Sequence, residues 1–402
     1  MHVVSDFMPA PHNWTENVRK NKTRRRQIVA LVKMREYLSA PVLADISLTN
    51  RCNLRCAYCY ASAGDEAYQV DEMRLEDYER VFDQLDAMNV HRISLSGGEP
   101  FVRKDFFDIL GAAEKHNFAI VINSNGCLIT EEVAKKLCGY RFDRICITID
   151  GSCAEVHDRI RGTGSFVKAL SGIRLLQKYN LPVSTLFTLN KTNIEDLINT
   201  IRFNEAMGIP YLSVMVMCPT GRAATGELLL TKEVWYPLFL RLSEMKKNNE
   251  IKLGFKIVPP NEGNVFWLFY FPLEYYNRLD LLKYWNQDID TDDDNEISCQ
   301  AGTKSISILC NGDVYGCDLM VGIKDFLAGN VLTTPLEEIW KNSEVFNRLR
   351  AIDKKCLTGK CHECEHKWCG GGCRSAAYNL DGSIYGSDLS CFYEAKEGTH
   401  NG

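Results

Sequence analysis

The chain has 402 residues, which is more than one hydrophobic core ordinarily organises, so we expect two or three domains. Its 45% hydrophobic and 25% charged residues are typical of a soluble globular protein and exclude a collagen-like, coiled-coil or wholly disordered chain. The formal net charge of −5 excludes a global field that would draw the protein to nucleic acid or to an anionic membrane.

The chain begins with a polar, basic stretch that is followed by apolar residues at helical spacing. Residues 1–40 are therefore expected to form an arm that ends in a helix. From residue 41 onward, short apolar runs alternate with amphipathic patterns. The predicted strands cover residues 42–47, 92–96, 119–123, 144–149, 183–189 and 211–217. The predicted helices cover residues 74–89, 105–116, 130–138, 166–178 and 193–207.

This alternation indicates right-handed β-α-β units around a parallel sheet. The six units are more than a small flavodoxin-like sheet needs and fewer than a closed eight-stranded barrel has. We therefore predict an α/β fold whose main domain, residues 41–222, is a partial (β/α)6 barrel.

Residues 223–297 are interpreted as a connecting region with a helix near 231–247. Their aromatic run, 265–271, is far too short to cross a bilayer. We expect a buried strand or helix there, with a wall that faces the substrate as the alternative. The acidic stretch 292–296 is expected to be a loop.

The alternation ends before the last segment, residues 298–402, which forms a small Cys-rich domain in our prediction. Strand-like residues 305–309 and the turn pair Asn311–Gly312 predict a β-hairpin. The tail after residue 356 is rich in Cys and Gly and poor in apolar periodicity. We expect that it needs a metal to become ordered.

The chain contains 17 cysteines, which is too low a proportion for a disulfide scaffold. The N-terminal residues carry no apolar segment of a secretory signal, so we expect a cytoplasmic protein whose thiols stay reduced. Reduced cysteines in groups usually hold metal. Five scattered cysteines are instead interpreted as small buried hydrophobes: Cys127, Cys138, Cys146, Cys153 and Cys218.

The first group of cysteines, Cys52, Cys56 and Cys59, directly follows the first predicted strand. In a parallel barrel, the loops after the strands form the active face. Three thiolates on one loop can hold three corners of a 4Fe–4S cube and leave one iron open to an external ligand. A zinc ion held by these thiolates and a distant histidine is the alternative.

Polar and glycine residues recur where the next three predicted strands end. They are Gly97, Gly98 and Glu99 after the second strand, Ser124 and Asn125 after the third, and Asp150 after the fourth. Glycine lets the backbone approach a ligand closely, and a carboxylate there can bind a ligand ammonium. Because the carboxyl ends of parallel strands meet at one face, these residues predict a ligand site beside the first cysteines.

Together these residues resemble the radical S-adenosylmethionine (SAM) superfamily over residues 42 to about 222. The resemblance rests on three cysteines at x3 and x2 spacing with Tyr58 before the last, on Gly-Gly-Glu-Pro at 97–100, and on motifs at 148–151 and 157–162. It implies that Cys52, Cys56 and Cys59 hold a 4Fe–4S cluster whose open iron is chelated by SAM. Glu99 and the neighbouring glycine backbone would hold the methionyl ammonium. The implied SAM-site residues are Tyr58, Gly97, Gly98, Glu99, Ser124, Asn125, Asp150 and Arg161.

The C-terminal cysteines resemble the SPASM extension of peptide-modifying radical enzymes, a twitch-type domain with two auxiliary 4Fe–4S clusters. By that resemblance Cys299, Cys317 and Cys373 hold the first auxiliary cluster. The ligands of the second are Cys361, Cys364, Cys369 and Cys391. A zinc ribbon is the alternative.

Two features depart from the SPASM pattern. Cys364 and Cys369 are separated by four residues where the family commonly has five, and the further ligand that often lies shortly before Cys299 is missing. The fourth site of the first auxiliary cluster is therefore left between Cys310, Cys356 and an open position.

The resemblance implies an enzyme that cleaves SAM reductively to a 5′-deoxyadenosyl radical, abstracts a substrate hydrogen and modifies the substrate oxidatively. The first hypothesis is a thioether or carbon–carbon crosslink in a ribosomally made peptide, and the alternative is a tetrapyrrole or another small cofactor-pathway molecule. An electron carrier without catalysis is disfavoured by the Gly-Gly-Glu-Pro element.

The implied partners include a low-potential electron donor such as flavodoxin or ferredoxin. About 40 residues before the first strand are too few for a winged-helix module that grips a leader peptide. Either a separate leader-peptide-binding protein or binding that needs no leader is therefore expected. Nucleic acid and membrane partners are not expected.

Overall fold

The computed structural model describes residues 37–65, 70–258, 267–285, 297–366 and 368–394. Three sequence predictions lie outside these residues: most of the N-terminal arm at 1–36, residues 265–266 of the aromatic run, and the acidic stretch at 292–296.

The strands form one sheet in the order β10-β9-β8-β1-β2-β3-β4-β5-β6-β7. The neighbours from β8 to β7 pair in parallel, whereas β9 pairs antiparallel with both β8 and β10. The strands are β1 (Leu43–Ser47), β2 (Arg92–Ser96), β3 (Ala119–Ser124), β4 (Arg144–Thr148), β5 (Val183–Leu189), β6 (Tyr211–Val216), β7 (Gly254–Val258), β8 (Ser305–Ile308), β9 (Asp313–Tyr315) and β10 (Gly329–Asn330).

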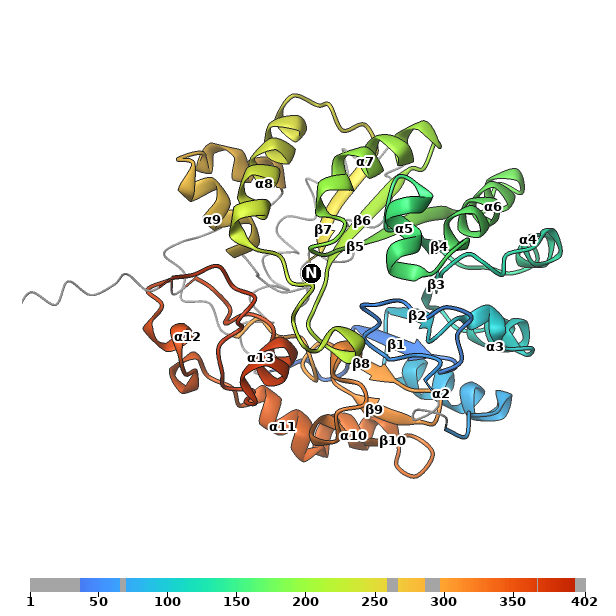
Figure 1. Cartoon of the computed structure of the whole chain (residues 1–402). Helices are drawn as coiled ribbons and strands as arrows, with labels where there is room; N and C mark the ends of the chain where they lie inside the picture. The colour runs from blue at the N-terminus through green and yellow to red at the C-terminus, as the bar shows by residue number, and fades with distance from the viewer. Residues whose placement is uncertain (1–36, 66–69, 259–266, 286–296, 367, 395–402) are drawn as a thin grey trace, which may run out of the picture.

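Helices surround this sheet on its outer side, and the sheet curves like a barrel that does not close (Figure 1). The helices of the barrel are α2 (Leu75–Ala87), α3 (Phe106–Ala113), α4 (Glu131–Leu137), α5 (Ala154–Arg161), α6 (Ser165–Lys178), α7 (Leu197–Ala206), α8 (Lys232–Lys247) and α9 (Trp267–Tyr275). The C-terminal helices are α10 (Leu336–Asn342), α11 (Glu344–Arg350), α12 (Lys360–Glu363) and α13 (Arg374–Asp381).

The predicted α/β partial barrel with a C-terminal extension is confirmed, and so is the hairpin at Asn311–Gly312, which is β8–β9. Two elements of the barrel were missed. The short helix α5 lies in a segment for which no helix was predicted, and β7 lies in the connecting region, where Gly254 and Lys256 interrupt the apolar run. The boundaries between the predicted domains stay a prediction.

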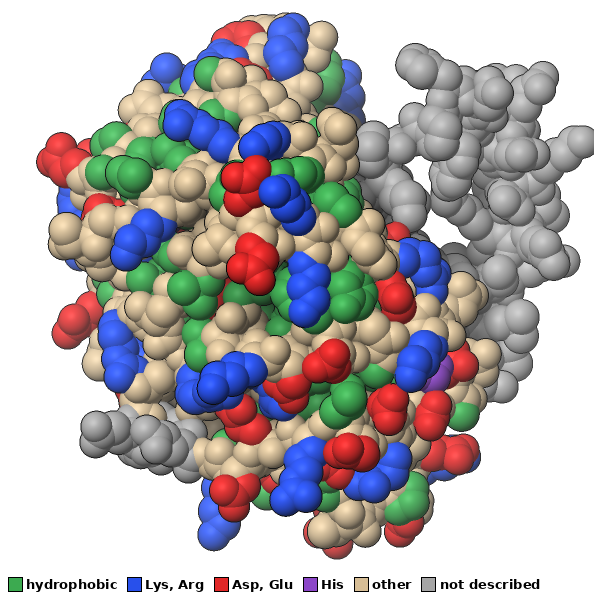
Figure 2. All heavy atoms as spheres, turned by 90° about the vertical axis from the view of Figure 1, so that its right-hand side faces the viewer, with side chains coloured by type: hydrophobic (Ala, Val, Ile, Leu, Met, Phe, Trp, Pro, Cys, Tyr) green, Lys and Arg blue, Asp and Glu red, His purple; other side chains and the backbone are tan. Residues whose placement is uncertain are grey.

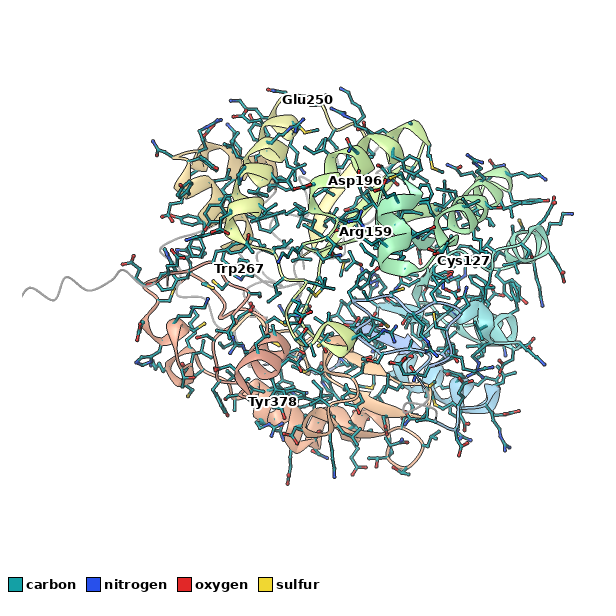
Figure 3. All side chains as sticks on the ribbon, in the orientation of Figure 1. Cys127, Arg159, Asp196, Glu250, Trp267 and Tyr378 are labelled. Atoms are coloured by element: carbon teal, nitrogen blue, oxygen red, sulfur yellow. The ribbon has the colours of Figure 1, made fainter. Side chains whose placement is uncertain are left out.

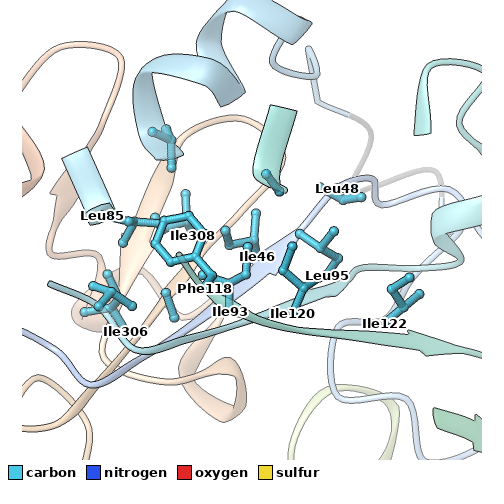
Figure 4. Packing of buried hydrophobic residues seen from close by; sticks show 14 of the residues in the cluster. Ile46, Leu48, Leu85, Ile93, Leu95, Phe118, Ile120, Ile122, Ile306 and Ile308 are labelled. Carbon is cyan, nitrogen blue, oxygen red and sulfur yellow. The ribbon is translucent and has the colours of Figure 1, made fainter. Parts of the chain in front are cut away.

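The C-terminal hairpin extends the barrel sheet, because β8 pairs in parallel with β1 from Leu43 opposite Ser305 onward. Isoleucines and leucines from both sides of this junction share one buried cluster (Figure 4). Ile46 of β1, Ile93 of β2 and Ile308 of β8 are all fully buried. β-Branched residues fit such strands, which are covered on both faces. The hairpin is therefore part of the barrel core.

Residues 267–271 of the aromatic run lie in the buried helix α9. A buried helix was one of the two conformations predicted for this run, the other being a buried strand. Helix α9 packs against α8, where Trp235 Nε1 donates to the carbonyl oxygen of Leu268 at 2.8 Å. The rings of Phe239 and Trp285 stack beside it with centroids 4.7 Å apart. This second core lies under the β5–β7 half of the sheet.

No helix within the described part of the chain is both long and apolar enough to cross a membrane. On the face of the molecule that carries α3, α4 and α6, basic and acidic side chains are interspersed (Figure 2).

Ile308→Ala tests whether the hairpin belongs to the barrel core. Ile308 is 0% exposed, so we expect its truncation to destabilise the whole protein by about 2–5 kcal/mol. Thermal unfolding followed by circular dichroism measures the loss as a lower midpoint. Leu332→Ala is the matched control: Leu332 is 47% exposed, so its truncation should change stability by less than about 0.5 kcal/mol. Equal effects of the two substitutions would contradict a shared core.

Candidate functional site

The loop after β1, here called the cluster loop (residues 49–65), brings Cys52, Cys56 and Cys59 together at the carboxyl end of the sheet. Backbone N–H groups already donate to two of the sulfurs, from Leu54 to Cys52 and from Ala63 to Cys59, both at 3.4 Å. Burial raises the pKa of Cys52 to about 11, and the charges of Glu99, Cys56 and Cys59 raise it further. Three partly buried thiols, whose charges influence one another, thus lie on one loop.

A buried polar network fixes the middle of this loop. Tyr58 Oη donates to Asp150 Oδ2 at 2.5 Å, and Arg161 Nε donates to the same oxygen at 2.5 Å. The other carboxylate oxygen accepts from the backbone N–H of Thr188 at 2.7 Å. Burial raises the pKa of Cys56, and the Arg161 charge partly offsets this rise. The network joins the ends of β4 and α5 to the cluster loop.

The sequence analysis predicted Tyr58, Asp150 and Arg161 as SAM contacts, and the structure brings all three together. Asp150 is 0% and Arg161 7% exposed, and their side chains form hydrogen bonds with protein groups. They hold the cluster loop in this structure, and a direct contact with SAM stays a prediction.

The segment after β6 clamps the other side of the cluster loop. Arg222 Nε donates to the Cys56 carbonyl oxygen at 2.8 Å, and the Arg222 backbone N–H donates to the Cys59 carbonyl oxygen at 3.0 Å. Gly221 has φ +55°, and a Cβ atom there would lie 2.3 Å from the carbonyl oxygens of Cys59 and Tyr60. Glycine is required because the two backbones touch.

Glu99 lies fully buried beside the cluster loop. Its carboxylate accepts from Ser124 Oγ and from the Asn125 backbone N–H, both at 2.8 Å. Burial raises its pKa to about 7, although these two hydrogen bonds lower it. A carboxylate with such a pKa gains from a cationic or N–H-rich ligand, because the ligand would offset the cost of burying the charge.

The glycines before Glu99 let its loop pack against the cluster loop. A Cβ atom on Gly97 would lie 2.5 Å from the Thr49 carbonyl oxygen, and one on Gly98 would lie 2.2 Å from that of Arg51. The loops are also joined by hydrogen bonds from Gly98 N to Thr49 O at 2.7 Å and from Glu99 N to Arg51 O at 3.0 Å. Asn125 Nδ2 adds a bond to Asn53 Oδ1 at 2.8 Å.

A second group of thiols, the inner thiol group, consists of Cys299, Cys317, Cys373 and Cys218. Burial raises the pKa of Cys299 to about 11, and the charge of Cys373 raises it further. Burial also raises the pKa of Cys317, with added contributions from Asp318, Cys299 and Cys373. Cys218 Sγ lies 3.9 Å from Cys373 Sγ. Their hydrogen bond raises the pKa of Cys218 and lowers that of Cys373.

The two other cysteines predicted for this region lie elsewhere. Cys310 is buried, and its carbonyl oxygen accepts from the backbone N–H of Met73 at 2.6 Å. The charges that act on its thiol come from Glu72 and Arg103. Cys356 is exposed, on the 3-10 turn Lys354–Cys356.

A third group, the outer thiol group, lines a cavity of about 430 Å³. Its members are Cys361, Cys364, Cys369 and Cys391, the four predicted for the second auxiliary cluster. Trp267 and Phe271 of α9 form the opposite wall, and Figure 3 shows Trp267 between α9 and the C-terminal segment. Burial raises the pKa of Cys369 to about 11.

The donor chemistry of all three groups fits iron–sulfur clusters, which bind cysteine thiolates. Among the described residues, no three His, Cys, Asp or Glu side chains converge on a site for a single metal ion. Two buried side-chain nitrogens have no hydrogen-bond partner within the described part of the chain, Trp267 Nε1 and Arg374 Nε. Trp267 lines the outer cavity, and Arg374 follows Cys373. An unpaired buried donor costs about 1–3 kcal/mol, and cluster sulfur is an acceptor that would satisfy it.

Comparison with known proteins agrees with this chemistry. Residues 46–203 match the Radical SAM superfamily, and residues 299–365 match the SPASM iron–sulfur cluster-binding domain. The chain is 30% identical over 363 residues to the AdoMet-dependent heme synthase of Methanosarcina barkeri, covering 88% of this chain and 97% of that protein. It is also 30% identical over 359 residues to the mycofactocin maturase of Mycobacterium tuberculosis, covering 88% of this chain and 83% of that protein.

Solved structures share the fold. The Streptococcus suis protein SuiB, bound to its precursor peptide SuiA, superposes with a TM-score of 0.71 at 18% identity. The match covers 98% of this chain and 86% of that chain. An anSMEcpe structure with bound AdoMet matches with a TM-score of 0.64 at 19% identity, over 87% of this chain and 94% of that chain.

The chain belongs to the radical SAM superfamily, among the members that carry a SPASM domain. It is a radical SAM enzyme whose cofactors are SAM and 4Fe–4S clusters, including auxiliary ones, as the sequence analysis predicted.

Sequence reasoning missed two features of the site. It predicted Cys218 as a small buried residue, which it is, but missed the contact with Cys373, for which its place after a predicted strand at this sheet edge was the available signal. Of the cysteines predicted to be buried in the same way, Cys138 and Cys153 are exposed, so that prediction was wrong for them. It also gave no role to Trp267 beyond a buried or substrate-facing wall, because nothing in the sequence places α9 against the outer thiol group.

Gly221→Ala tests the clamp on the cluster loop. The added methyl group would overlap two carbonyl oxygens of that loop, so we expect the loop to shift and its cluster to be lost. Iron content and absorbance after anaerobic reconstitution measure the loss, which should be about four irons per chain. Gly208→Ala is the control: its φ is +67°, but nothing lies within 4 Å of the added methyl group. It should keep its iron and cost about 1 kcal/mol of stability. Normal iron content in Gly221→Ala would rule out the clamp.

Proposed function

We propose that Cys52, Cys56 and Cys59 hold the cluster that binds SAM, and that the enzyme oxidatively modifies a peptide. The observation that carries this proposal is the contact between the cluster loop and the Glu99 loop, made by the hydrogen bonds from Gly98 to Thr49 and from Glu99 to Arg51. It sets the buried carboxyl group of Glu99 next to three thiols that would leave one iron of a cube without a protein ligand.

The roles of the chain's own groups follow from this arrangement. Glu99 would accept N–H bonds from the amino group of SAM, and Ser124 and Asn125 would hold the carboxylate in place for it. Asp150 and Arg161 would keep Tyr58, and with it the cluster loop, in one position. The cluster and SAM that these residues would hold would together supply one-electron reductive cleavage of SAM and, from it, hydrogen-atom abstraction from the substrate.

The C-terminal thiols favour an oxidative outcome. A substrate that has lost a hydrogen atom must lose one further electron and a proton to become a crosslinked or dehydrogenated product. The outer thiol group offers four protein ligands, and a fully ligated cluster accepts or relays an electron without binding the substrate. A low-potential flavodoxin or ferredoxin is proposed as the donor that starts each turnover.

A peptide substrate is supported by similarity to a mycofactocin maturase over 88% of this chain. The fold is also that of SuiB, which has been solved with its precursor peptide. A crosslink within such a peptide is the specific reaction that we propose, with a separate leader-binding protein as partner.

A tetrapyrrole is the second candidate substrate. The heme synthase of Methanosarcina barkeri is matched over 97% of its own length, so the two proteins have nearly the same extent. Its reaction would be oxidative decarboxylation of a propionate, which also removes one hydrogen atom and one electron from the substrate.

The anaerobically reconstituted enzyme with dithionite and SAM should release 5′-deoxyadenosine. Short peptides encoded beside the gene should raise this release roughly tenfold and lose two hydrogen atoms, as mass spectrometry would show. Stimulation by an iron porphyrin that carries propionate side chains, with loss of carbon dioxide, would select the second candidate instead. The Cys56→Ala variant is the negative control. If no 5′-deoxyadenosine forms under strong reduction, the radical reaction itself is wrong.

The raised pKa of Glu99 predicts a pH-dependent affinity for SAM. The ionised carboxylate accepts N–H bonds and the protonated form does so poorly, so SAM binding should weaken as pH falls through about 7. Anaerobic calorimetry from about pH 8 to about pH 6 should give up to a tenfold rise in Kd per pH unit below the pKa. Glu99→Gln should bind SAM weakly with a shallower pH profile. An unchanged slope in Glu99→Gln would mean that another group titrates.

A further inference from the structure

The inner thiol group contains four cysteines, one more than the three that the resemblance to the SPASM domain assigned to the first auxiliary cluster. We propose that Cys218 is the fourth protein ligand of the first auxiliary 4Fe–4S cluster, together with Cys299, Cys317 and Cys373. This assignment rests on the proposed roles of those three cysteines. With this assignment, the first auxiliary cluster has four protein ligands, one of which comes from the barrel.

The first argument is position. Cys218 lies two residues beyond β6, at the carboxyl end of the barrel sheet, and Cys373 lies immediately before α13. Their sulfur atoms are 3.9 Å apart across 155 positions of sequence. Cys218 is 6% and Cys373 4% exposed, and with Ala376 they form a separate buried cluster. Two distant segments are thus folded so that two thiols meet in the interior.

The second argument is the surroundings of this pair. The negative charges that act on Cys218 come from Cys373, Asp388 and Cys317. The negative charges of Cys299 and Cys373 act in turn on the thiol of Cys317. Electrostatic interactions thus connect Cys218, Cys317, Cys299 and Cys373 with one another, although each comes from a different segment of the chain. Four thiolates are the ligand number of a closed 4Fe–4S cluster.

The third argument is the polar groups that act on these thiols. Cys373 accepts hydrogen bonds from the backbone N–H groups of Ser375 and Ala376 in the first turn of α13, which favour its thiolate. The fully buried Arg374 uses both terminal nitrogens on carbonyl oxygens, yet its Nε has no partner among the described residues. Its positive charge acts on Cys299. A cluster with four thiolate ligands is anionic and would pair with this guanidinium.

The competing ligands fit less well. Cys310 lies among Glu72, Arg103 and the Met73 backbone, and Cys356 is exposed on a surface turn. No described contact joins either cysteine to Cys299, Cys317 or Cys373. The remaining alternative for Cys218 is a disulfide with Cys373, which would remove two ligands and needs an external oxidant.

The test uses the full chain with Cys52, Cys56 and Cys59 replaced by Ala, so that all remaining iron belongs to the auxiliary clusters. Anaerobic reconstitution with iron and sulfide should give about eight irons per chain in this background. Adding Cys218→Ala should lower the count by one to four irons, and mild oxidation should give the EPR signal of a 3Fe–4S cluster, because one corner has lost its ligand. Cys146→Ala is the matched control, since Cys146 is equally buried at 6% but bonds to Ser184 in β4–β5.

The outcomes separate the inference from the proposed function. About eight irons and an unchanged spectrum with Cys218→Ala would overturn the role of Cys218 alone. Absence of iron in the triple background would overturn the auxiliary clusters and this inference together.

A second measurement covers the case in which Cys218→Ala does not fold. In the reconstituted wild-type protein, Cys218 should resist alkylation by iodoacetamide and should react at least tenfold faster after iron chelation under reducing conditions. A disulfide-linked Cys218–Cys373 peptide from the iron-loaded protein, or equal alkylation with and without iron, would overturn the inference.

Discussion

The buried interaction among Asp150, Arg161 and Tyr58 is the constraint on which the active face depends. Asp150 is completely buried, so its charge is tolerable only because Arg161 and two hydrogen-bond donors surround it. Removing any partner would leave a charge in the interior. The end of β4, the end of α5 and the middle of the cluster loop are therefore held in a single arrangement before any cofactor binds.

From that fixed loop, contacts spread to both sides. On one side, the glycines before Glu99 let the loop after β2 pack against the cluster loop. On the other side, Gly221 and Arg222 of the loop after β6 contact it. That same loop carries Cys218 at its start. The five residues 218–222 thus contact the backbone of the cluster loop through Arg222 and contribute Cys218 to the inner thiol group. A short stretch of backbone therefore connects the cluster loop with the inner thiol group.

The sequence predicted the first six strands and the local thiol motifs well because both depend on neighbours in the chain. Apolar runs specify strands, and three cysteines on one loop must lie together. It failed where contacts are distant. Nothing in the sequence relates Cys218 to Cys373, which lie 155 positions apart. Gly254 and Lys256 interrupt the apolar pattern of β7, so the strand was not recognised. The neighbours of Trp267 depend on where α9 packs in the fold. Asp150 was predicted as a site residue from its place after a strand, but its hydrogen bond with Tyr58 could be seen only in the fold.

The parallel pairing of β8 with β1 has a consequence for biosynthesis. β1 lies between β2 and β8, so one of its edges is completed only by a strand from the C-terminal part. Synthesis runs from the N-terminus, and roughly three-quarters of the chain must emerge before β8 exists. Until then the nascent barrel carries an unpaired strand edge next to the cluster loop. The cysteines of the cluster loop are therefore open on that side while the eight cysteines from Cys310 to Cys391 have not yet been made.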